Sequence, residues 1–255
     1  METRGRVVVV TGGAGGIGAA LCQRFAADGA ERVVVSDLNA QAAENVAADI
    51  GGLAVVADVT VESDVQRLVA TTLKAHGRID IYCSNAGIAF GGGPEASDQA
   101  WQQSWEVHVM SHVYAARALL PAMLARRNGY IVGTVSAAGL LNHVLAAPYA
   151  VTKAAGLSFL EWLAIAHHDQ GLRVSALCPQ GVRTAMLTQE GGSFLRAGAL
   201  EPEQVADAVV EAIRDERFLV LPHPEVSEYF QRKADDYDRW LRGMRRLRAR
   251  ILEER

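Results

Sequence analysis

The sequence predicts an α/β protein: a doubly wound parallel sheet with helices on both faces, arranged in three layers. Short apolar runs rich in β-branched residues alternate with helical patterns along almost the whole chain. This order places successive strands parallel to one another. The runs are apolar at every position rather than at alternate positions, as expected for strands that are covered on both faces.

The elements follow one another in a regular order. The predicted strands span residues 7–10, 33–36, 53–57, 79–83, 130–135, 174–178 and 218–221. The predicted helices span residues 17–28, 40–49, 62–76, 98–127, 149–170 and 202–215. No linker rich in proline, glycine and serine divides these elements. Residues 1–255 are therefore predicted to form a single domain, in which residues 224–255 are a C-terminal helical extension.

The composition argues against nucleic-acid-binding, disulfide-linked, secreted and membrane-spanning proteins. The net charge is −4 and the pI is near 6.0, which predicts no general attraction to nucleic acid. Cys22, Cys83 and Cys178 lie far apart within apolar runs, which favours buried thiols in a reducing compartment over disulfides or zinc. The sequence shows neither a signal-peptide pattern nor an apolar run long enough to cross a bilayer. These features predict a cytoplasmic protein that does not bind a membrane.

A glycine-rich turn joins the first strand to the first helix, between Thr11 and Gly18. Glycines at such a turn let the backbone approach a pyrophosphate, whose negative charge suits the N-terminus of a helix. The alternative is a tight turn that binds no ligand. The position of the glycine-rich turn between a strand and a helix favours dinucleotide binding. The predicted cofactor contacts in this turn are Gly12, Gly15, Gly16, Ile17 and Gly18.

Asp37 and Leu38 follow the second strand. An acidic side chain at this place can accept hydrogen bonds from the adenosine ribose hydroxyls of NAD, and it would repel the 2′-phosphate of NADP. No arginine adjoins Asp37 in the sequence. The sequence therefore predicts NAD rather than NADP, with a helix-capping or turn role for Asp37 as the alternative.

Other candidate cofactor contacts also follow strands. Because ligands of open α/β sheets bind at the carboxyl ends of the strands, these segments are expected to line one crevice. For Asn85, a structural role that ties strand ends together competes with direct contact to the cofactor. The candidates are Asp58, Val59, Asn85, Ala86, Gly87, Pro179, Val182 and Thr184.

Tyr149 and Lys153 are four residues apart at the start of a predicted helix. Residues at this spacing share one helix face, so the phenol and the ammonium point the same way. A cation favours the phenolate, which makes the pair a candidate for proton transfer near neutral pH. Most pairs of this kind are solvated surface residues. Ser136, at the end of the fifth strand, strengthens the catalytic interpretation because its hydroxyl can hold a substrate oxygen.

These motifs together resemble the short-chain dehydrogenase/reductase family, whose fold is of the Rossmann type. The glycine turn matches the family's cofactor loop, and Asn85-Ala86-Gly87 matches its strand-four motif. Ser136 and Tyr149-x-x-x-Lys153 match its catalytic signature in order and spacing. The resemblance implies that Tyr149 and Lys153 also contact the cofactor. The resemblance covers roughly residues 4–222, so the implied expectation is an NAD-dependent enzyme.

Two positions depart from the family pattern. His108 stands where the family has an asparagine that holds a water bound to the catalytic lysine. His108 is therefore a candidate member of the proton relay. His108 and His112 also have the spacing of a metal pair, but no third ligand lies at a suitable spacing, so no metal is predicted. Gln180 replaces a glycine after strand six, where its side chain points either to the substrate or into a loop.

The resemblance implies a mechanism. Tyr149 donates a proton to a carbonyl during reduction or takes one from an alcohol during oxidation. Ser136 hydrogen-bonds the same oxygen. Lys153 lowers the pKa of the tyrosine and holds the nicotinamide ribose. With an acidic residue at position 37, alcohol oxidation is the expected direction.

The substrate is expected to be a small, mainly apolar secondary alcohol or ketone. Residues 88–96, 140–148 and 185–199 are expected to select it. The second segment is predicted to form a loop that leads into the Tyr149 helix. It is mostly apolar and contains His143, either a polar substrate contact or an exposed loop residue. The third segment carries Met186, Leu187, Phe194 and Leu195.

The tail, residues 225–254, is predicted to form one or two helices. Trp240, Met244, Leu247 and Ile251 make an apolar stripe, and arginines occupy many of the other positions. The tail could bind nucleic acid or a membrane surface, or it could pack on the chain's own core or on a sister subunit. The acidic residues that flank it favour packing.

Family members are commonly homotetramers or homodimers. The rival to an enzyme is an NAD-binding regulator that has lost turnover.

Overall fold

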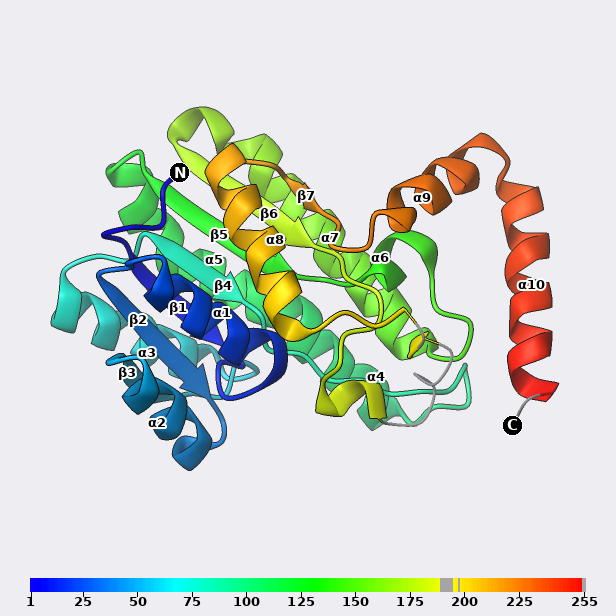
Figure 1. The fold of residues 1–255 in the computed structure, drawn as a ribbon, viewed down its shortest axis with the longest axis horizontal. Helices are drawn as coiled ribbons and strands as arrows, with labels where there is room; N and C mark the ends of the chain where they lie inside the picture. Colours follow the sequence, from blue (N-terminus) through cyan, green and yellow to red (C-terminus); the bar gives the residue numbers. More distant parts are fainter. Residues whose placement is uncertain (189–194, 197, 254–255) are drawn as a thin grey trace.

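The structure is a computed structural model that describes residues 1–188, 195–196 and 198–253 (Figure 1). Phe194 and Glu254 lie outside the described residues. The strands form a seven-stranded parallel sheet in the order β3-β2-β1-β4-β5-β6-β7. This is the predicted doubly wound fold. The strands are β1 Val7–Thr11, β2 Arg32–Asp37, β3 Leu53–Val56, β4 Ile81–Ser84, β5 Gly129–Thr134, β6 Leu172–Leu177 and β7 Leu219–Val220.

Helices cover both faces of the sheet (Figure 1). On one face, alternate side chains of β1 and β2 pack with helices α1, α2 and α8. On the other face, Val9 and Val34 share a core with helices α3, α5 and α7. Burial on both faces explains the unbroken apolar runs of the strands. The helices are α1 Gly16–Ala27, α2 Ala40–Asp49, α3 Glu62–His76, α4 Asp98–Trp105, α5 Ser111–Ala125, α7 Ala147–His167 and α8 Pro202–Asp215.

The strand order reverses between β1 and β4. The chain moves outward from β1 through β2 to β3, then returns to pair β4 with the other side of β1. The loops that follow β1 and β4 therefore separate and leave a crevice at the carboxyl ends of the strands. This crevice is where the sequence places the cofactor.

The long middle helix and the segment before Tyr149 differ from expectation. The helix predicted over residues 98–127 contains a π-helical turn, Glu106–Met110, between α4 and α5. Residues 140–148, predicted as a loop, belong partly to a short helix, α6 Ala137–Leu141, and to α7, which begins at Ala147. Ser136 caps α6 because its Oγ accepts a hydrogen bond from the Ala138 amide at 3.1 Å. Short 3₁₀ turns occupy His168–Gln170 and Ala185–Thr188.

The tail forms two helices, α9 Glu225–Asp235 and α10 Tyr237–Glu253. Helix α9 packs against α6, and α10 packs against α9. Figure 1 shows α10 standing apart from the sheet, on the side of α6 and α9. Among the described residues, no helix is both long and apolar enough to cross a membrane.

Candidate active site

A cavity of about 790 Å³ opens at the carboxyl ends of β1, β4, β5 and β6. It brings together most of the residues that the sequence predicts for catalysis and cofactor binding. Four predicted residues are absent from its described lining: Leu38, Asp58, Val59 and His108. The predicted residues that do line it are Gly12, Gly15, Gly16, Ile17, Gly18, Asp37, Asn85, Ala86, Gly87, Ser136, Tyr149, Lys153, Pro179, Val182 and Thr184.

The glycine turn fits a dinucleotide pyrophosphate. Gly12 and Gly16 have positive φ angles of 63° and 51°, which side chains rarely adopt. A Cβ on Gly18 would lie 1.9 Å from the carbonyl oxygen of Gly12, whereas one on Gly15 would meet nothing within 4 Å. Within the described chain, no side chain caps the N-terminus of α1 and no acidic residue lies in its first turn. The free amides of this turn can therefore bind an anion.

Asp37 holds the edge of this turn. Its carboxylate accepts hydrogen bonds from the amides of Ala14 and Asn39, both at 3.1 Å. The bond from Ala14 holds the carboxylate beside the glycine turn. The bond from Asn39 fits the alternative role of Asp37 as a turn residue. The side chain of Leu38 is 67% exposed beside it. Asp58 closes a turn of its own, since its Oδ1 accepts from the amide and hydroxyl of Thr60.

Asn85 ties three strand ends together. Its backbone amide donates to the Thr11 hydroxyl and its Nδ2 donates to the Thr11 carbonyl, both at 3.0 Å. Its Oδ1 accepts from the Thr134 hydroxyl at 3.0 Å. These bonds link β1, β4 and β5 across the crevice and confirm the structural role. Because Asn85 also lines the cavity, contact with a cofactor remains a prediction.

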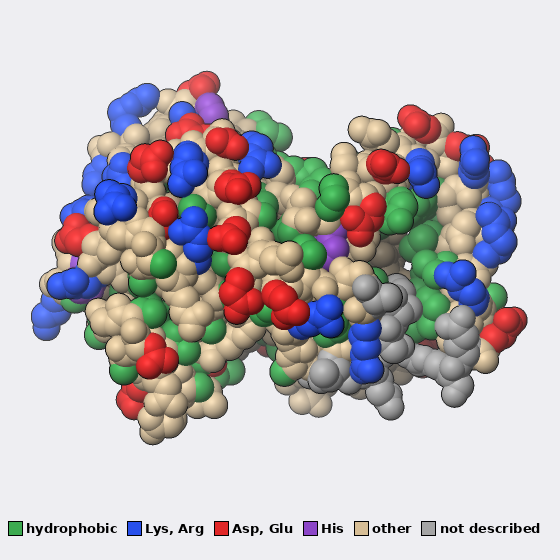
Figure 2. All heavy atoms as spheres, in the orientation of Figure 1, with side chains coloured by type: hydrophobic (Ala, Val, Ile, Leu, Met, Phe, Trp, Pro, Cys, Tyr) green, Lys and Arg blue, Asp and Glu red, His purple; other side chains and the backbone are tan. Residues whose placement is uncertain are grey.

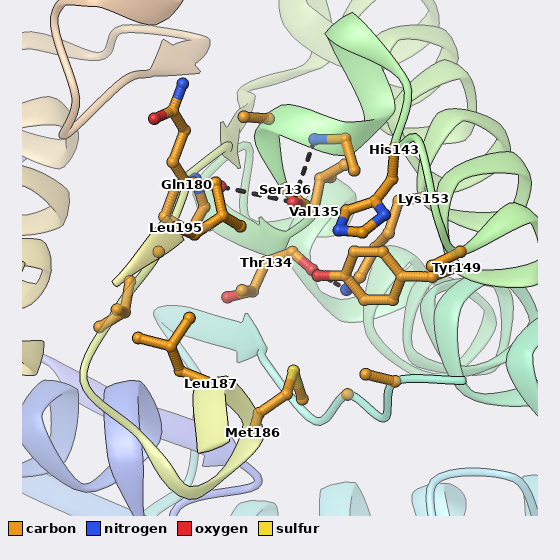
Figure 3. Close-up of a pocket in the computed structure, with 18 of the residues that line it drawn as sticks. Thr134, Val135, Ser136, His143, Tyr149, Lys153, Gln180, Met186, Leu187 and Leu195 are labelled. Atoms are coloured by element: carbon orange, nitrogen blue, oxygen red, sulfur yellow. Dashed lines mark hydrogen bonds between the residues drawn. The ribbon is translucent and has the colours of Figure 1, made fainter. Parts of the chain in front are cut away.

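Ser136, Tyr149 and Lys153 gather on one side of the pocket, with Met186 and Leu187 across from them (Figure 3). The side chains of Ser136 and Tyr149 line the same cavity, and the Ser136 hydroxyl donates to the Pro179 carbonyl at 3.4 Å. The Lys153 ammonium lies 5.7 Å from the centre of the Tyr149 ring and donates to the Thr134 carbonyl at 2.8 Å. A ligand in this cavity can therefore reach both hydroxyl-bearing side chains.

The pKa values of the pair reflect burial. Burial raises the pKa of Tyr149 above its usual value, and the hydrogen bond from Ser136 partly offsets this rise. The sequence predicts a lowered tyrosine pKa, which differs from the structure because desolvation of the phenolate dominates. Burial also lowers the pKa of Lys153 to about 7. Both groups are therefore desolvated, and the charge state of Lys153 changes near neutral pH.

His108 projects from the π-helical turn and is buried behind Tyr149. Its Nε2 accepts from the Ile88 amide at 3.3 Å, so Nδ1 carries the proton and donates to the Thr152 hydroxyl at 2.8 Å. That hydroxyl donates in turn to the Pro148 carbonyl at 2.7 Å. Burial and the nearby Lys153 charge lower the pKa of His108 well below its usual value. A neutral His108 therefore links the π-helical turn to the Ile88 loop and to α7.

Replacing His108 by leucine is expected to lower the free energy of unfolding by about 1–3 kcal/mol, because the Ile88 amide and the Thr152 hydroxyl lose their partner. Urea unfolding would measure the change. His168→Leu, at an exposed position, is the matched control and is expected to leave stability close to that of the parent. Equal stability of the His108 and His168 variants would contradict this positioning role.

Three residues of the site were missed by sequence reasoning. Thr134 and Thr152 take part in the bonds of Asn85, Lys153 and His108 described above. The third, His223, is buried after β7; its Nδ1 accepts from the Gln180 amide at 3.2 Å and its Nε2 donates to the Gly181 carbonyl at 3.1 Å. His223 thereby fixes the turn that follows β6. The rule that sites lie after parallel strands could have found it, since it follows the seventh predicted strand.

The predicted substrate segments meet over the catalytic residues. Phe90, Val144 and Leu187, one from each segment, line the cavity together with His143 and Gln180. His143 is half-buried, its desolvation lowers its pKa, and its ring lies 6.4 Å from that of Tyr149. The reading of His143 as an exposed loop residue is therefore wrong. Gln180 lines the cavity, and in Figure 3 its side-chain amide extends away from Ser136 and Tyr149. A substrate-facing role for this side chain stays a prediction.

Comparisons with known proteins agree with this geometry. A family model described as short chain dehydrogenase matches residues 6–192. The chain is 35% identical, over 92% of its length and 90% of the relative's, to 1-deoxy-11-beta-hydroxypentalenate dehydrogenase of Streptomyces exfoliatus. It is 38% identical to 2,5-dichloro-2,5-cyclohexadiene-1,4-diol dehydrogenase of Sphingobium indicum, over 73% of this chain and 76% of that one.

A solved structure is also similar. It is a short chain dehydrogenase/reductase from Burkholderia phymatum in complex with NAD, with a TM-score of 0.87 and 27% sequence identity. The match covers 93% of this chain and 96% of that chain. The similarity therefore extends over most of both chains.

Proposed function

The chain belongs to the short-chain dehydrogenase family and is an NAD-dependent oxidoreductase, and from this premise we propose that Tyr149, Ser136 and Lys153 carry out its proton transfer. When bound, NAD accepts or supplies the hydride. The glycine turn and Asp37 would hold its adenosine half. Val182 and Thr184 would hold the carboxamide, and Lys153 would hold the nicotinamide ribose. The cavity that joins these residues to Tyr149 supports this assignment.

Tyr149 is the proposed acid and base. Its hydroxyl donates a proton to a substrate carbonyl oxygen in reduction and takes the alcohol proton in oxidation. Ser136 donates a hydrogen bond to the same oxygen and stabilises the charge that develops there. A protonated Lys153 beside the ring favours the phenolate. The carrying observation is that Ser136, Tyr149 and Lys153 line one cavity, with the Lys153 ammonium 5.7 Å from the centre of the Tyr149 ring.

A small, mainly apolar secondary alcohol or ketone is the proposed substrate. Leu141, Met186, Leu187 and Leu195 give the pocket an apolar lining next to the catalytic hydroxyls. The similar proteins are named as dehydrogenases of cyclic hydroxy compounds, which favours an enzyme over a regulator and oxidation as the direction. A panel of secondary alcohols and ketones, followed by the absorbance of NADH, tests the proposal. Failure of every member of the panel to react would contradict it.

NAD preference is expected to depend on Asp37. Replacing Asp37 by serine and Leu38 by arginine removes a negative charge and adds a positive one where the 2′-phosphate of NADP would lie. We expect the ratio of the Kd values for NADPH and NADH to fall by at least about tenfold in favour of NADPH, because one such charge contact is worth more than about 1.4 kcal/mol. Quenching of protein fluorescence measures both affinities. Tighter binding of NADPH than of NADH by the parent would contradict the role of Asp37.

We propose that the chain assembles as a homodimer or homotetramer through α7. This helix exposes an apolar stripe that includes Val151, Trp162 and Ile165, the last two 57% and 82% exposed. Trp105 adds to it from α4, which packs beside α7. Contiguous exposed apolar side chains of this size are typical of interfaces. Sedimentation of the double variant Trp162→Glu, Ile165→Glu is expected to show a smaller species than the parent, and an unchanged mass would contradict the interface.

Two further expectations remain proposals. We propose a cytoplasmic location because the three cysteines are free and buried, which suits a reducing compartment. We also propose that residues 1–255 fold as one domain, with 224–255 as its extension. The seven-stranded sheet and the packing of α9 on α6 support this proposal.

A further inference from the structure

Helices α9 and α10, which we call the arm (residues 225–253), hold the segment between the two proposed catalytic hydroxyls. Lys233 of α9 donates a hydrogen bond to the Leu140 carbonyl at 2.5 Å. Arg248 of α10 donates to the Val144 carbonyl at 3.1 Å. Both carbonyls lie between Ser136 and Tyr149 in the chain. The arm is therefore attached at two points to the part of the protein that shapes the substrate end of the cavity.

The apolar stripe of α10 faces that cavity. Trp240, Met244 and Leu247, spaced four and three residues apart, line the same cavity as Ser136 and Tyr149. Trp240 also packs against the main core cluster. Figure 2 shows apolar side chains along the inner side of the arm, facing the hollow between the arm and the body, and basic side chains along its outer side. The stripe predicted from the sequence thus forms a wall of the pocket.

Charge does not oppose an apolar ligand at this wall. Arg232 of α9 also lines the cavity. Its guanidinium pairs with Glu228 at 3.1 Å and lies 5.8 Å from the Tyr229 ring centre. Both side chains of this pair are exposed, at 65% and 67%, so the charge of Arg232 stays in contact with water. Phe90 and Leu187 also line the cavity, so apolar side chains from other segments accompany those of α10.

A short alcohol held by Tyr149 and Ser136 would leave the stripe of α10 in contact with water. A bulkier apolar substrate would cover it, and burial of apolar surface is favourable by about 25 cal/mol per Å². We propose that the arm is the outer wall of the substrate pocket. Within the proposed class of small-molecule secondary alcohols, the preferred substrates are those with a bulky apolar carbon skeleton that packs on Trp240, Met244 and Leu247. This inference rests on the proposed function of the same site.

The test compares charged substitutions on the two sides of one helix. Met244→Arg and Leu247→Arg place a guanidinium in the apolar wall. Leu252→Arg, at a position 44% exposed and absent from the described lining of the cavity, is the matched control. The probes are 2-decalol and borneol as bulky alcohols and 2-butanol as a small one. Binding of 2-decalone to the enzyme–NADH complex, followed by NADH fluorescence, gives a readout that does not need turnover.

We expect the parent to have a higher kcat/KM for 2-decalol and borneol than for 2-butanol. Both inner variants are expected to lose at least about tenfold in kcat/KM for the bulky alcohols and in affinity for 2-decalone. Their loss of activity on 2-butanol should be smaller than their loss on the bulky alcohols. Their NADH affinity should stay within about twofold of the parent, a difference below about 0.4 kcal/mol. The Leu252 variant should match the parent throughout.

Three results would overturn the inference: a parent that prefers 2-butanol, inner and outer variants that behave alike, or inner variants that change the sedimenting mass. The last result would make the stripe a subunit contact. A parent that binds 2-decalone through the arm but oxidises none of the alcohols would instead contradict the proposed function and leave the arm's role supported. A parent that neither binds 2-decalone nor oxidises a bulky alcohol would contradict the arm's role.

Discussion

Tyr149→Phe is expected to lower kcat for alcohol oxidation by about 10²- to 10⁴-fold, the usual contribution of a positioned general acid or base. The substitution removes one oxygen atom and leaves the ring in its place against His108, whose centre lies 5.4 Å away. NADH binding should therefore stay close to that of the parent. Steady-state rates from NADH absorbance and NADH affinity from fluorescence measure the two effects separately.

The matched control for this substitution is Tyr114→Phe, which removes a hydroxyl from α5, away from the described cavity lining. Its kcat should equal that of the parent. If the Tyr149 variant keeps the parent's turnover, the assignment of this phenol as proton donor is wrong. If it instead loses NADH binding and turnover together, the residue acts by holding the cofactor.

Replacing Lys153 by methionine is expected to lower kcat by about 10²- to 10³-fold, the range found when one electrostatic contact to a developing charge is removed. The ammonium that favours the Tyr149 phenolate is lost, and so is the donor to the Thr134 carbonyl. The proposed contact with the nicotinamide ribose is lost as well, so the KM for NAD should rise. Turnover close to that of the parent would contradict the role of Lys153.

The same substitution should affect stability in a pH-dependent way. Burial lowers the pKa of Lys153 to about 7 in the folded protein, whereas an unfolded lysine titrates at about 10.4. Between these values the unfolded chain binds the extra proton, so the parent becomes less stable as the pH falls from about 10.4 to about 7. Below the folded pKa both states carry the proton, and this loss of stability stays constant.

Relative to the parent, Lys153→Met should therefore gain stability as the pH falls from 9.5 to 7.5. Urea unfolding of the cofactor-free protein at these two pH values measures the difference, in which the other titrating groups cancel. Lys74→Met, at an exposed position on α3, should show no such change. A stability difference that is the same at both pH values would show that burial does not lower the Lys153 pKa.

The sequence by itself determined the fold class, and it predicted which residues would gather at one crevice. Unbroken apolar runs and alternating helices predict a parallel sheet, and such a sheet brings the ends of its strands to one edge. Gly12, Asn85 and Ser136 could therefore be assigned to one crevice without a structure. The spacing of Tyr149 and Lys153 placed both on one face of a helix, because helical geometry is local.

Only the tertiary structure decided the environment of these groups. Burial raises the pKa of Tyr149 and lowers that of Lys153, and burial depends on what packs from distant parts of the chain. The hydrogen bonds of His108 and His223 join residues far apart in sequence. The place of His223 after a strand is visible in the sequence, but the partners of both side chains are not. The stripe of α10 was visible in the sequence. Its position over the substrate pocket was not, because an amphipathic pattern specifies which face is apolar and leaves open what that face will cover.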